Sequence, residues 1–384
     1  MRVALVHDWL TGMRGGEKVL SVLCRLLPDA DLFTLIHTPG ACDRSIERMR
    51  IITSCLNDLP WVERYYRCLL PVMPLAVESL DLEGYDLIIS SSHCVAKGII
   101  RPPESLHVCY CHTPMRYAWS QAEQYHQTMG LLGLALRAVR GYLRAWDRRS
   151  AGHVDCFIAN SHNVGRRILR SYGRHSEVVY PPVDTDLFSP GRKPREDFYL
   201  MVTAMAPYKR VDQAVLAFSR LGRRLVIIGR GQQSRQLMKN ATENISFLGW
   251  QSDEVVRDHY RRCRALIFPG EEDFGMVPAE AMACGAPVIS YRGGGAGETV
   301  LDVDAPDPNG PTGLLYGPQT PEALAAAVKR FEQVEHCFAP RHAANWARRF
   351  SGRTFTEGIK RVVGPMLRRR GLGQPWSNDT TDSH

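Results

Sequence analysis

Short apolar runs, rich in valine and isoleucine, recur along the chain and alternate with stretches in which apolar residues have helical spacing. This alternation is typical of a parallel sheet that is buried on both faces and has crossover helices between its strands. In the first half the predicted strands are Val3–Val6, Asp86–Ser90, Leu106–Cys111 and Cys156–Ala159. In the second half they are Phe198–Thr203, Leu225–Ile228, Ile245–Leu248, Ala265–Phe268, Val288–Tyr291 and Gly313–Tyr316. The pattern predicts an α/β protein with two parallel-sheet layers.

A proline- and glycine-rich stretch separates the two halves. Residues 180–195 contain Tyr-Pro-Pro-Val-Asp and then Ser-Pro-Gly-Arg-Lys-Pro-Arg, which cannot continue a helix or a central strand. A chain of 384 residues also suits two domains of ordinary size. We expect one domain over 1–184, a linker near 184–196, a second domain over 197–350, a final helix over 351–367 and a disordered tail over 368–384.

Composition narrows the class of protein. The chain is 44% hydrophobic and 23% charged, which is typical of a soluble globular protein, and its net charge of +8 favours anionic partners. Such partners include nucleotide diphosphates, acidic lipid headgroups and nucleic acid. The 11 cysteines have no zinc-site spacing, and no apolar run is long enough for a signal peptide or a membrane span. These features predict a protein of the cytoplasm.

The segment over residues 272–289, EDFGMVPAEAMACGAPVI, carries the most specific chemistry. Glu272 and Glu280 flank a Phe-Gly turn at which a helix is predicted to begin. The N–H groups at a helix N-terminus bind anions, and carboxylates accept hydrogen bonds from hydroxyl groups. Helix capping would explain an acid at the turn, but Glu280 lies too far into the helix for that role. The segment therefore predicts a nucleotide-sugar pocket, in which the backbone N–H groups are those of Phe274, Gly275, Met276 and Val277.

Three further segments follow predicted strands and are candidate phosphate sites. Gly15 and Gly16 precede a predicted helix over 17–27, although a glycine pair also suits an ordinary turn. Lys209 and Arg210 follow the turn after the strand at 198–203, where doubly wound sheets bind ligands, although a solvated helix start would look the same. Arg230 lies between two glycines after the next strand. A complete dinucleotide fingerprint after the first strand is absent, which argues against an NAD enzyme.

Candidate acceptor residues gather in the first half. His112 ends a predicted strand, where a lone histidine is more often an ordinary surface or core residue. Its place in the segment His-Thr-Pro-Met-Arg-Tyr, which carries the resemblance given below, favours a role in holding the reacting sugar or acceptor over that of a nucleophile. The neighbouring candidates are Asp8, Trp9, Arg116, Tyr117 and Trp119. A basic amphipathic helix is predicted over 131–149. It suits either an anionic membrane surface or a core helix with a solvated basic edge.

The chain resembles the retaining glycosyltransferases of family 4, which have the GT-B fold. The resemblance rests on the E-x7-E segment, on His112-Thr-Pro-Met-Arg-Tyr-Ala-Trp, on Pro207-Tyr-Lys-Arg-Val-Asp and on the glycine-rich residues 293–297. It implies two Rossmann-like domains around a cleft: an N-terminal acceptor domain, a C-terminal donor domain and a last helix that crosses back to the first. Many relatives have an arginine where this chain has Ala204, so Arg210 or Arg230 is expected to supply that charge.

The resemblance also implies residue roles. Lys209 and Arg210 would neutralise the leaving diphosphate, Glu272 would lie beside the sugar, and Glu280 would accept from ribose hydroxyls. Gly15 and Gly16 would face the donor diphosphate.

The implied reaction is transfer of a hexose, with retention, onto a hydroxyl of a glycan on a polyprenyl diphosphate carrier. The mannosyltransferase-like branch implies GDP-mannose as donor and a role in bacterial surface polysaccharides, with possible peripheral attachment to the inner face of the membrane. The alternatives are a UDP-sugar donor, a sugar-nucleotide epimerase or hydrolase, and a non-catalytic binder of nucleic acid or membrane. No metal is expected: three Asp-x-Asp tripeptides, at 29–31, 184–186 and 302–304, lie in loops or the linker.

Overall fold

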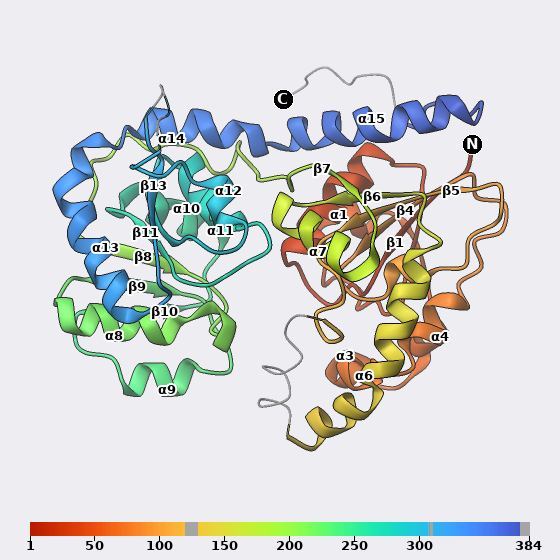
Figure 1. The fold of residues 1–384 in the computed structure, drawn as a ribbon, viewed down its shortest axis with the longest axis horizontal. Helices are drawn as coiled ribbons and strands as arrows, with labels where there is room; N and C mark the ends of the chain where they lie inside the picture. Colours follow the sequence, from red (N-terminus) through yellow and green to blue (C-terminus); the bar gives the residue numbers. More distant parts are fainter. Residues whose placement is uncertain (120–129, 306, 308–309, 377–384) are drawn as a thin grey trace. The chain divides into compact units, whose positions relative to one another are not determined.

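The computed structural model describes residues 1–119, 130–305, 307 and 310–376, and it describes the side chains of all of these except 130–138. The chain forms two compact units (Figure 1). Unit 1 combines Met1–Pro182 with Phe355–His384, and unit 2 is Val183–Thr354. Unit 1 is therefore built from two segments that are far apart in the sequence.

Unit 1 contains a parallel sheet of seven strands in the order β3-β2-β1-β4-β5-β6-β7. The strands are β1 (Val3–His7), β2 (Asp31–Thr34), β3 (Arg50–Thr53), β4 (Leu87–Ser92), β5 (Leu106–Cys111), β6 (Cys156–Ala159) and β7 (Ser176–Val178). Every described residue of β1, β4 and β5 is buried, because these central strands are covered on both faces.

Two apolar clusters cover the two faces of this sheet. On one face α1 (Gly15–Leu26) and α15 (Gly352–Arg369) pack through side chains such as Leu20 and Phe355. On the other face α4 (Met73–Glu78) and α6 (Gly130–Ala151) pack through side chains such as Val77 and Trp146 (Figure 1). The other helical segments are α2 (Arg44–Glu47), η1 (Cys55–Asp58), α3 (Val62–Tyr65), η2 (Tyr66–Leu69), η3 (Ala96–Gly98) and α7 (His162–Tyr172).

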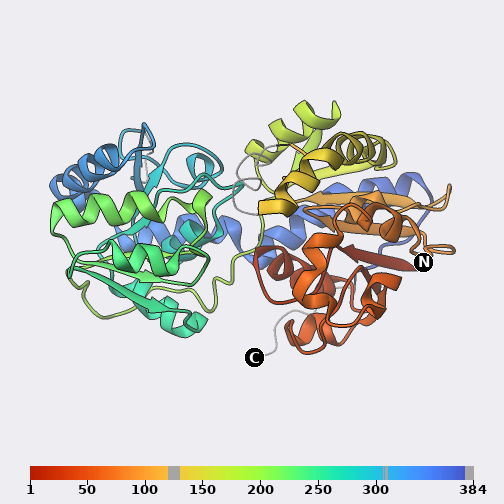
Figure 2. The same ribbon diagram turned by 90° about the horizontal axis from the view of Figure 1, so that it is seen from below.

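Unit 2 contains a parallel sheet of six strands in the order β10-β9-β8-β11-β12-β13. The strands are β8 (Tyr199–Val202), β9 (Leu225–Ile228), β10 (Ile245–Gly249), β11 (Leu266–Phe268), β12 (Val288–Tyr291) and β13 (Gly313–Tyr316). The helices α8 (Val211–Leu221) and α13 (Pro321–Val334) lie side by side on one face, as Figures 1 and 2 show. The other helical segments are η4 (Pro207–Lys209), α9 (Ser234–Lys239), α10 (Asp253–Arg262), α11 (Met276–Ala283), α12 (Ala296–Thr299), η5 (Glu335–Cys337), α14 (Pro340–Ala347) and η6 (Arg348–Phe350).

The architecture confirms the predicted fold class, two α/β units with parallel sheets. Three strands of unit 1 have no counterpart in the sequence-based prediction, namely β2, β3 and β7. Each has at most two apolar residues beside charged or hydroxyl side chains, so no apolar run stands out from the surroundings.

The ends of the two units differ in detail from the predicted boundaries. Residues 184–196, expected to be a linker, belong to unit 2, where Phe188 is buried against Tyr260 and Arg261 Nε donates to the Ser189 carbonyl at 2.7 Å. The expected disordered tail is corrected over its described part, 368–376. Arg370 donates to the Ser105 carbonyl at 2.6 Å, and Trp376 is only 7% exposed in the unit 1 core. Residues 377–384 lie outside the described residues.

The basic helix expected near 131–149 corresponds to α6. The side chains of 131–138 lie outside the description, and the rest of the helix packs on the protein. Trp146 is buried, Arg140 Nε donates to the Ala118 carbonyl at 3.3 Å, and Arg148 Nε donates to the Ser171 carbonyl at 3.2 Å. This half of the basic stripe therefore holds neighbouring segments of unit 1. Over the described part of the chain, no helix combines the length and the apolar character needed to cross a bilayer.

Candidate active site

The carboxyl ends of β1, β4 and β5 bring a group of polar side chains to one edge of the unit 1 sheet. His7 ends β1, Ser91 is the penultimate residue of β4, and His112 directly follows β5. The Ser91 hydroxyl lies 3.1 Å from His7 Nδ1 and 2.9 Å from His112 Nε2, so it bridges the two imidazoles. The His112 main chain is fixed as well, because its carbonyl accepts from Asn160 Nδ2 at 3.0 Å. His112 is thus held in one orientation at the edge where such sheets bind ligands.

The N-terminus of α1 lies against these imidazoles. A Cβ atom built on Gly16 would be 3.5 Å from His7 Cε1 and 3.8 Å from His112 Nε2. Any larger side chain would have to displace a ring or the helix. The first N–H groups of a helix have no partner within the helix, so Gly15 and Gly16 bring bare backbone donors close to His112. Two elements that sequence analysis singled out separately are therefore neighbours.

Burial determines the charge of His112. Burial lowers its pKa well below the usual value, and the positive charge of His93 lowers it further. The imidazole is therefore neutral at neutral pH. A neutral ring donates through one nitrogen and accepts through the other, which suits contacts with hydroxyl groups.

Asp8 lies beneath the site, fully buried. Its Oδ2 accepts from the backbone N–H groups of His93 and Cys94 at 2.7 and 3.1 Å, and its Oδ1 accepts from those of Val95 and Ala96 at 2.6 and 2.8 Å. Sequence analysis expected Asp8 to contact the acceptor. In the structure both its oxygens accept from backbone N–H groups of the loop after β4, so Asp8 positions that loop.

His93 is a residue of this site that sequence analysis missed. Its Nδ1 lies 2.9 Å from Asp8 Oδ2, and its side chain is 29% exposed. Burial alone would lower the pKa of His93, but the charge and hydrogen bond of Asp8 raise it overall. The same pair acts on Asp8: burial would raise its pKa, but His93, through its charge and hydrogen bond, and the backbone N–H groups lower it overall. The signal in the sequence was the position of His93 three residues after the predicted strand Asp86–Ser90; in the structure it directly follows β4.

The aromatic candidates near this site pack into the protein. The Trp9 ring is buried and lies edge-on to His93, with ring centroids 4.6 Å apart. Tyr117 and Trp119 are partly buried against the same apolar cluster, and Trp119 Nε1 donates to Asp147 Oδ2 at 2.6 Å. The positive charge of Arg116 contributes to the pKa values of both His93 and His112, which places Arg116 near them. Trp119 thus fastens the segment after β5 to α6.

In unit 2 the residues after β8 and β11 meet at one sheet edge. Lys209 Nζ donates to Glu272 Oε1, and the two side chains are 15% and 20% exposed. A Cβ built on Gly270 would lie 3.1 Å from Lys209 Cα, so the two loops pack backbone against backbone. The structure therefore joins the cation and the first carboxylate that sequence analysis assigned to the donor.

The loop before α11 is held by the glycine-rich segment that follows β12. Gly295 N donates to the Glu272 carbonyl at 2.8 Å, and a Cβ on Gly295 would lie only 2.4 Å from Phe274 Cα. Phe274 is buried edge-on against Phe350, and Gly275 enters the helix with φ of +94°. The loop thus has one conformation, which places Gly275 as N-cap of α11.

The first turn of α11 leaves backbone donors available for an anion. Met276 and Val277 are its first two residues, and Pro278, the third, has no N–H group. Further along the helix Glu280 is 6% exposed, and its Oε2 accepts from the hydroxyl of the buried Tyr260 at 3.3 Å. Tyr260 therefore fixes one oxygen of this carboxylate.

The two arginines expected to replace the missing charge at Ala204 lie in different surroundings. Arg210 begins α8 with φ of +54°, and its Nη2 lies 3.5 Å from Asp212 Oδ2. Arg230 follows β9 and passes over Gly249, where an added Cβ would be 3.2 Å from its Nε. No cluster of three or more potential metal-binding side chains occurs among the residues that the structure describes.

Comparison with known proteins assigns both halves of the chain to families. Residues 13–187 match the family described as Glycosyltransferase Family 4, and residues 183–349 match the family described as Glycosyl transferases group 1. An uncharacterized glycosyltransferase of Methanocaldococcus jannaschii is 30% identical over 57% of this chain and 62% of its own length. A D-inositol 3-phosphate glycosyltransferase of Rhodococcus jostii is 27% identical over 52% of this chain and 51% of its own. The matches thus span only about half to three fifths of these relatives.

Solved structures share the fold over nearly the whole chain. Anabaena HepE, crystallised with UDP, superposes with a TM-score of 0.68 at 16% identity, covering 95% of this chain and 100% of its own. Sucrose-phosphate synthase of Thermosynechococcus elongatus superposes with a TM-score of 0.69 at 18% identity, covering 96% and 100%. With both halves matched in order, the chain belongs to the glycosyltransferases of the GT-B fold.

Proposed function

We propose that the protein transfers a hexose from a nucleotide sugar to a hydroxyl group of a glycan acceptor, with retention of anomeric configuration and without a metal ion. The observation that carries the proposal is the Lys209–Glu272 pair, in which Glu272 lies four residues before Met276, the first residue of α11. A cation and bare backbone N–H groups at one edge suit a departing diphosphate, on which negative charge grows in the transition state.

The carboxylates of unit 2 have complementary roles in this proposal. Glu272 orients Lys209 and accepts from hydroxyls of the transferred sugar, and Glu280, whose Oε2 also accepts from Tyr260, accepts from ribose hydroxyls. In unit 1, neutral His112 contacts the reacting sugar or the acceptor. Asp8 is buried and engaged with backbone N–H groups, which makes it a poor glycosyl nucleophile. Front-face displacement, in which the leaving phosphate helps to deprotonate the acceptor hydroxyl, agrees with this arrangement.

The donor that we favour is GDP-mannose, and the acceptor is a lipid-linked glycan of surface polysaccharide synthesis. This choice rests on the resemblance of the segments around His112 and Lys209 to mannosyltransferases. The second candidate is a UDP sugar. It is favoured by a different observation, because the structurally similar Anabaena HepE was solved with UDP and with UDP-glucose.

A thermal-shift panel tests the donor. Wild-type protein is heated with GDP-mannose, UDP-glucose, UDP-galactose or UDP-N-acetylglucosamine, with and without EDTA. A donor at 100 times its Kd stabilises the native state by about 2.7 kcal/mol. The matched controls are Lys209→Met, which should lose the shift, and Lys239→Met, which removes an exposed lysine of unit 2 and should keep it.

The outcomes separate the candidates. A shift with a UDP sugar and none with GDP-mannose refutes the donor choice, and loss of the shift in EDTA refutes metal independence. Turnover of donor without any acceptor indicates an epimerase or hydrolase. Nucleotide binding that is equal in wild type and Lys209→Met refutes the proposed donor site. The anomeric configuration of the product, read by NMR, tests retention.

A further inference from the structure

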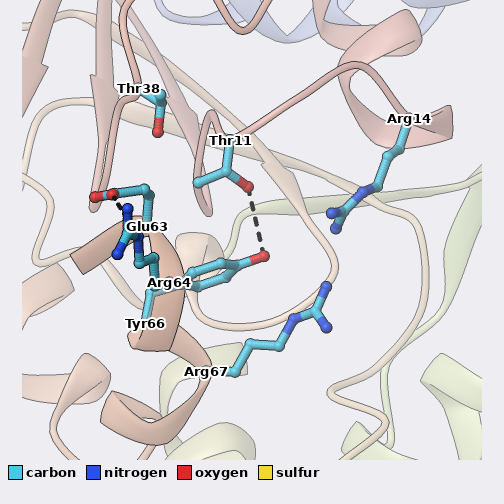
Figure 3. A pocket seen from close by; sticks show the side chains of 7 residues that line it. All are labelled: Thr11, Arg14, Thr38, Glu63, Arg64, Tyr66 and Arg67. Atoms are coloured by element: carbon cyan, nitrogen blue, oxygen red, sulfur yellow. Dashed lines mark hydrogen bonds and ion pairs between the residues drawn. The ribbon is translucent and has the colours of Figure 1, made fainter. Parts of the chain in front are cut away.

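Unit 1 contains a pocket that the residues discussed so far do not use. It has a volume of about 300 Å³. It lies between the loop after β1, the loop after β2 and the consecutive segments α3 and η2 (Figure 3). Its lining residues are Thr11, Arg14, Thr38, Glu63, Arg64, Tyr66 and Arg67. The residues come from three separate stretches of sequence, so the fold itself creates this pocket.

The lining is strongly cationic. Three guanidinium groups face one carboxylate, an excess of two positive charges. That carboxylate, Glu63, is turned towards Arg64, with 3.8 Å between Oε1 and Nε. Arg14 and Arg67 extend from opposite sides towards the space beside the Tyr66 hydroxyl, as Figure 3 shows. This is an arrangement for an anion with several oxygens.

The pKa of Tyr66 reflects the positive charges around its hydroxyl group. Burial raises its pKa, but the hydrogen bond with Thr11 and the charges of Arg67 and Arg14 lower it overall. Thr11 Oγ1 lies 3.4 Å from the Tyr66 hydroxyl, and the Tyr66 ring is buried against Trp9. The hydroxyl groups of Thr11 and Tyr66 therefore lie beside the guanidinium groups of Arg14 and Arg67. Arginine binds phosphate oxygens in pairs through its planar fork, and hydroxyl groups complete such sites.

The pocket is linked to the proposed site by one short loop. Arg14 is the N-cap residue of α1, and the next two residues are Gly15 and Gly16, of which Gly16 lies against His7 and His112. The side chain of Arg14 lines the pocket, while the backbone that follows it lies at the histidines. An anion bound by Arg14 in the pocket would thus contact the same loop that lies against His7 and His112.

We propose that this pocket binds a phosphate or diphosphate group of the acceptor substrate. The inference rests on the proposed function, because it names the chemical class of the acceptor of that same site. Two sources share this chemistry, a lipid phosphate and a soluble sugar phosphate. The surface beside the pocket supplies the reason to test a lipid source: Trp61 is 69% exposed directly before α3, and Leu59 is 38% exposed.

The first experiment measures binding of inorganic pyrophosphate by calorimetry. The donor site is filled beforehand with the nucleoside diphosphate, GDP or UDP, of the sugar nucleotide that stabilises the protein in the thermal-shift panel. Arg14→Gln and Arg67→Gln should each weaken pyrophosphate binding by roughly tenfold or more, since each removes charge-assisted hydrogen bonds. Glu63→Gln should strengthen it, an effect that loss of fold cannot produce. Arg48→Gln, which removes an exposed arginine elsewhere in unit 1, is the charge-matched control and should change nothing.

The second experiment identifies the source. Sedimentation is measured with phosphatidylcholine vesicles that contain undecaprenyl phosphate, with vesicles that contain the same fraction of phosphatidylglycerol, and with pure phosphatidylcholine. A lipid source predicts retention by the undecaprenyl phosphate vesicles, and loss of that retention in Arg14→Gln, Arg67→Gln and Trp61→Ser. A soluble source predicts pyrophosphate binding without selective retention.

The proposal is overturned if wild-type protein does not bind pyrophosphate, or if Arg14→Gln and Arg67→Gln bind it as wild type does. It is also overturned if the nucleoside diphosphate competes with pyrophosphate for the same site. Failure of the proposed function would look different: Lys209→Met would then leave the nucleotide shift intact, whatever the pyrophosphate results.

Discussion

Replacement of Asp8 by asparagine should destabilise unit 1 severely although it changes one atom. Asp8 is fully buried and accepts from four consecutive backbone N–H groups, those of residues 93–96. An asparagine offers one oxygen and one NH₂ group. Whichever way the amide is turned, the NH₂ group faces two of these N–H donors, which then have no acceptor.

The magnitude follows from that count. A buried hydrogen-bonding group left without a partner costs about 1–3 kcal/mol, so two such groups cost about 2–6 kcal/mol. The substitution also removes the carboxylate that pairs with the imidazole of His93. Because a domain has a net stability of roughly 5–15 kcal/mol, the substitution removes a large fraction of it.

Urea unfolding followed by circular dichroism measures this effect. Asp8→Asn should lower the midpoint without changing the slope, whereas the control Asp81→Asn should change stability by less than about 0.5 kcal/mol. Asp81 is exposed and caps a single N–H group, that of Glu83. If Asp8→Asn cost less than about 1 kcal/mol, the account of Asp8 as the anchor of the loop after β4 would be wrong.

Three further predictions concern both units. Lys209→Ala should lower kcat by roughly 10²–10³-fold in a transfer assay, because it removes a donor to the leaving diphosphate, and a smaller loss than tenfold would contradict that role. Gly295→Ala should cost about 1–3 kcal/mol and reduce the nucleotide-induced shift, because its Cβ would overlap Phe274, whereas Gly352→Ala, which meets nothing within 4 Å, should be tolerated. The raised pKa of His93 means that its charged pair with Asp8 contributes stability below the unfolded pKa of about 6.5 and loses it as pH rises through the folded value. The Tm of wild type should therefore fall more than that of His93→Gln between pH 6 and pH 9, and parallel curves would count against the pair.

The sequence predicted the sheets better than the contacts at their edges. Strands such as Leu106–Cys111 and Leu225–Ile228 have the bounds expected, because an apolar run between turns is a local property. Strands with few apolar residues, such as Asp31–Thr34, take their structure from pairing with β1, which no local pattern records.

The candidate site shows the same division. The pairing of Lys209 with Glu272 joins two segments that sequence analysis placed in one donor site by resemblance. The role of Asp8 could not be predicted, since it depends on a loop 85 to 88 residues away. His93 and the arginine pocket were missed for the same reason. Each depends on residues that the strand order of the sheet brings together, although they are far apart in the sequence.

The split composition of unit 1 has a consequence for biosynthesis. Its apolar cluster is completed by Phe355, Ile359, Val363, Leu367 and Trp376, which are translated after all of unit 2. A nascent chain on the ribosome therefore exposes the part of this apolar face that α1 does not cover while the second half is being made. Unit 2, whose residues are contiguous, can finish folding first. A protein truncated before residue 355 would lack the last part of the unit 1 core and would therefore tend to aggregate rather than form an isolated domain.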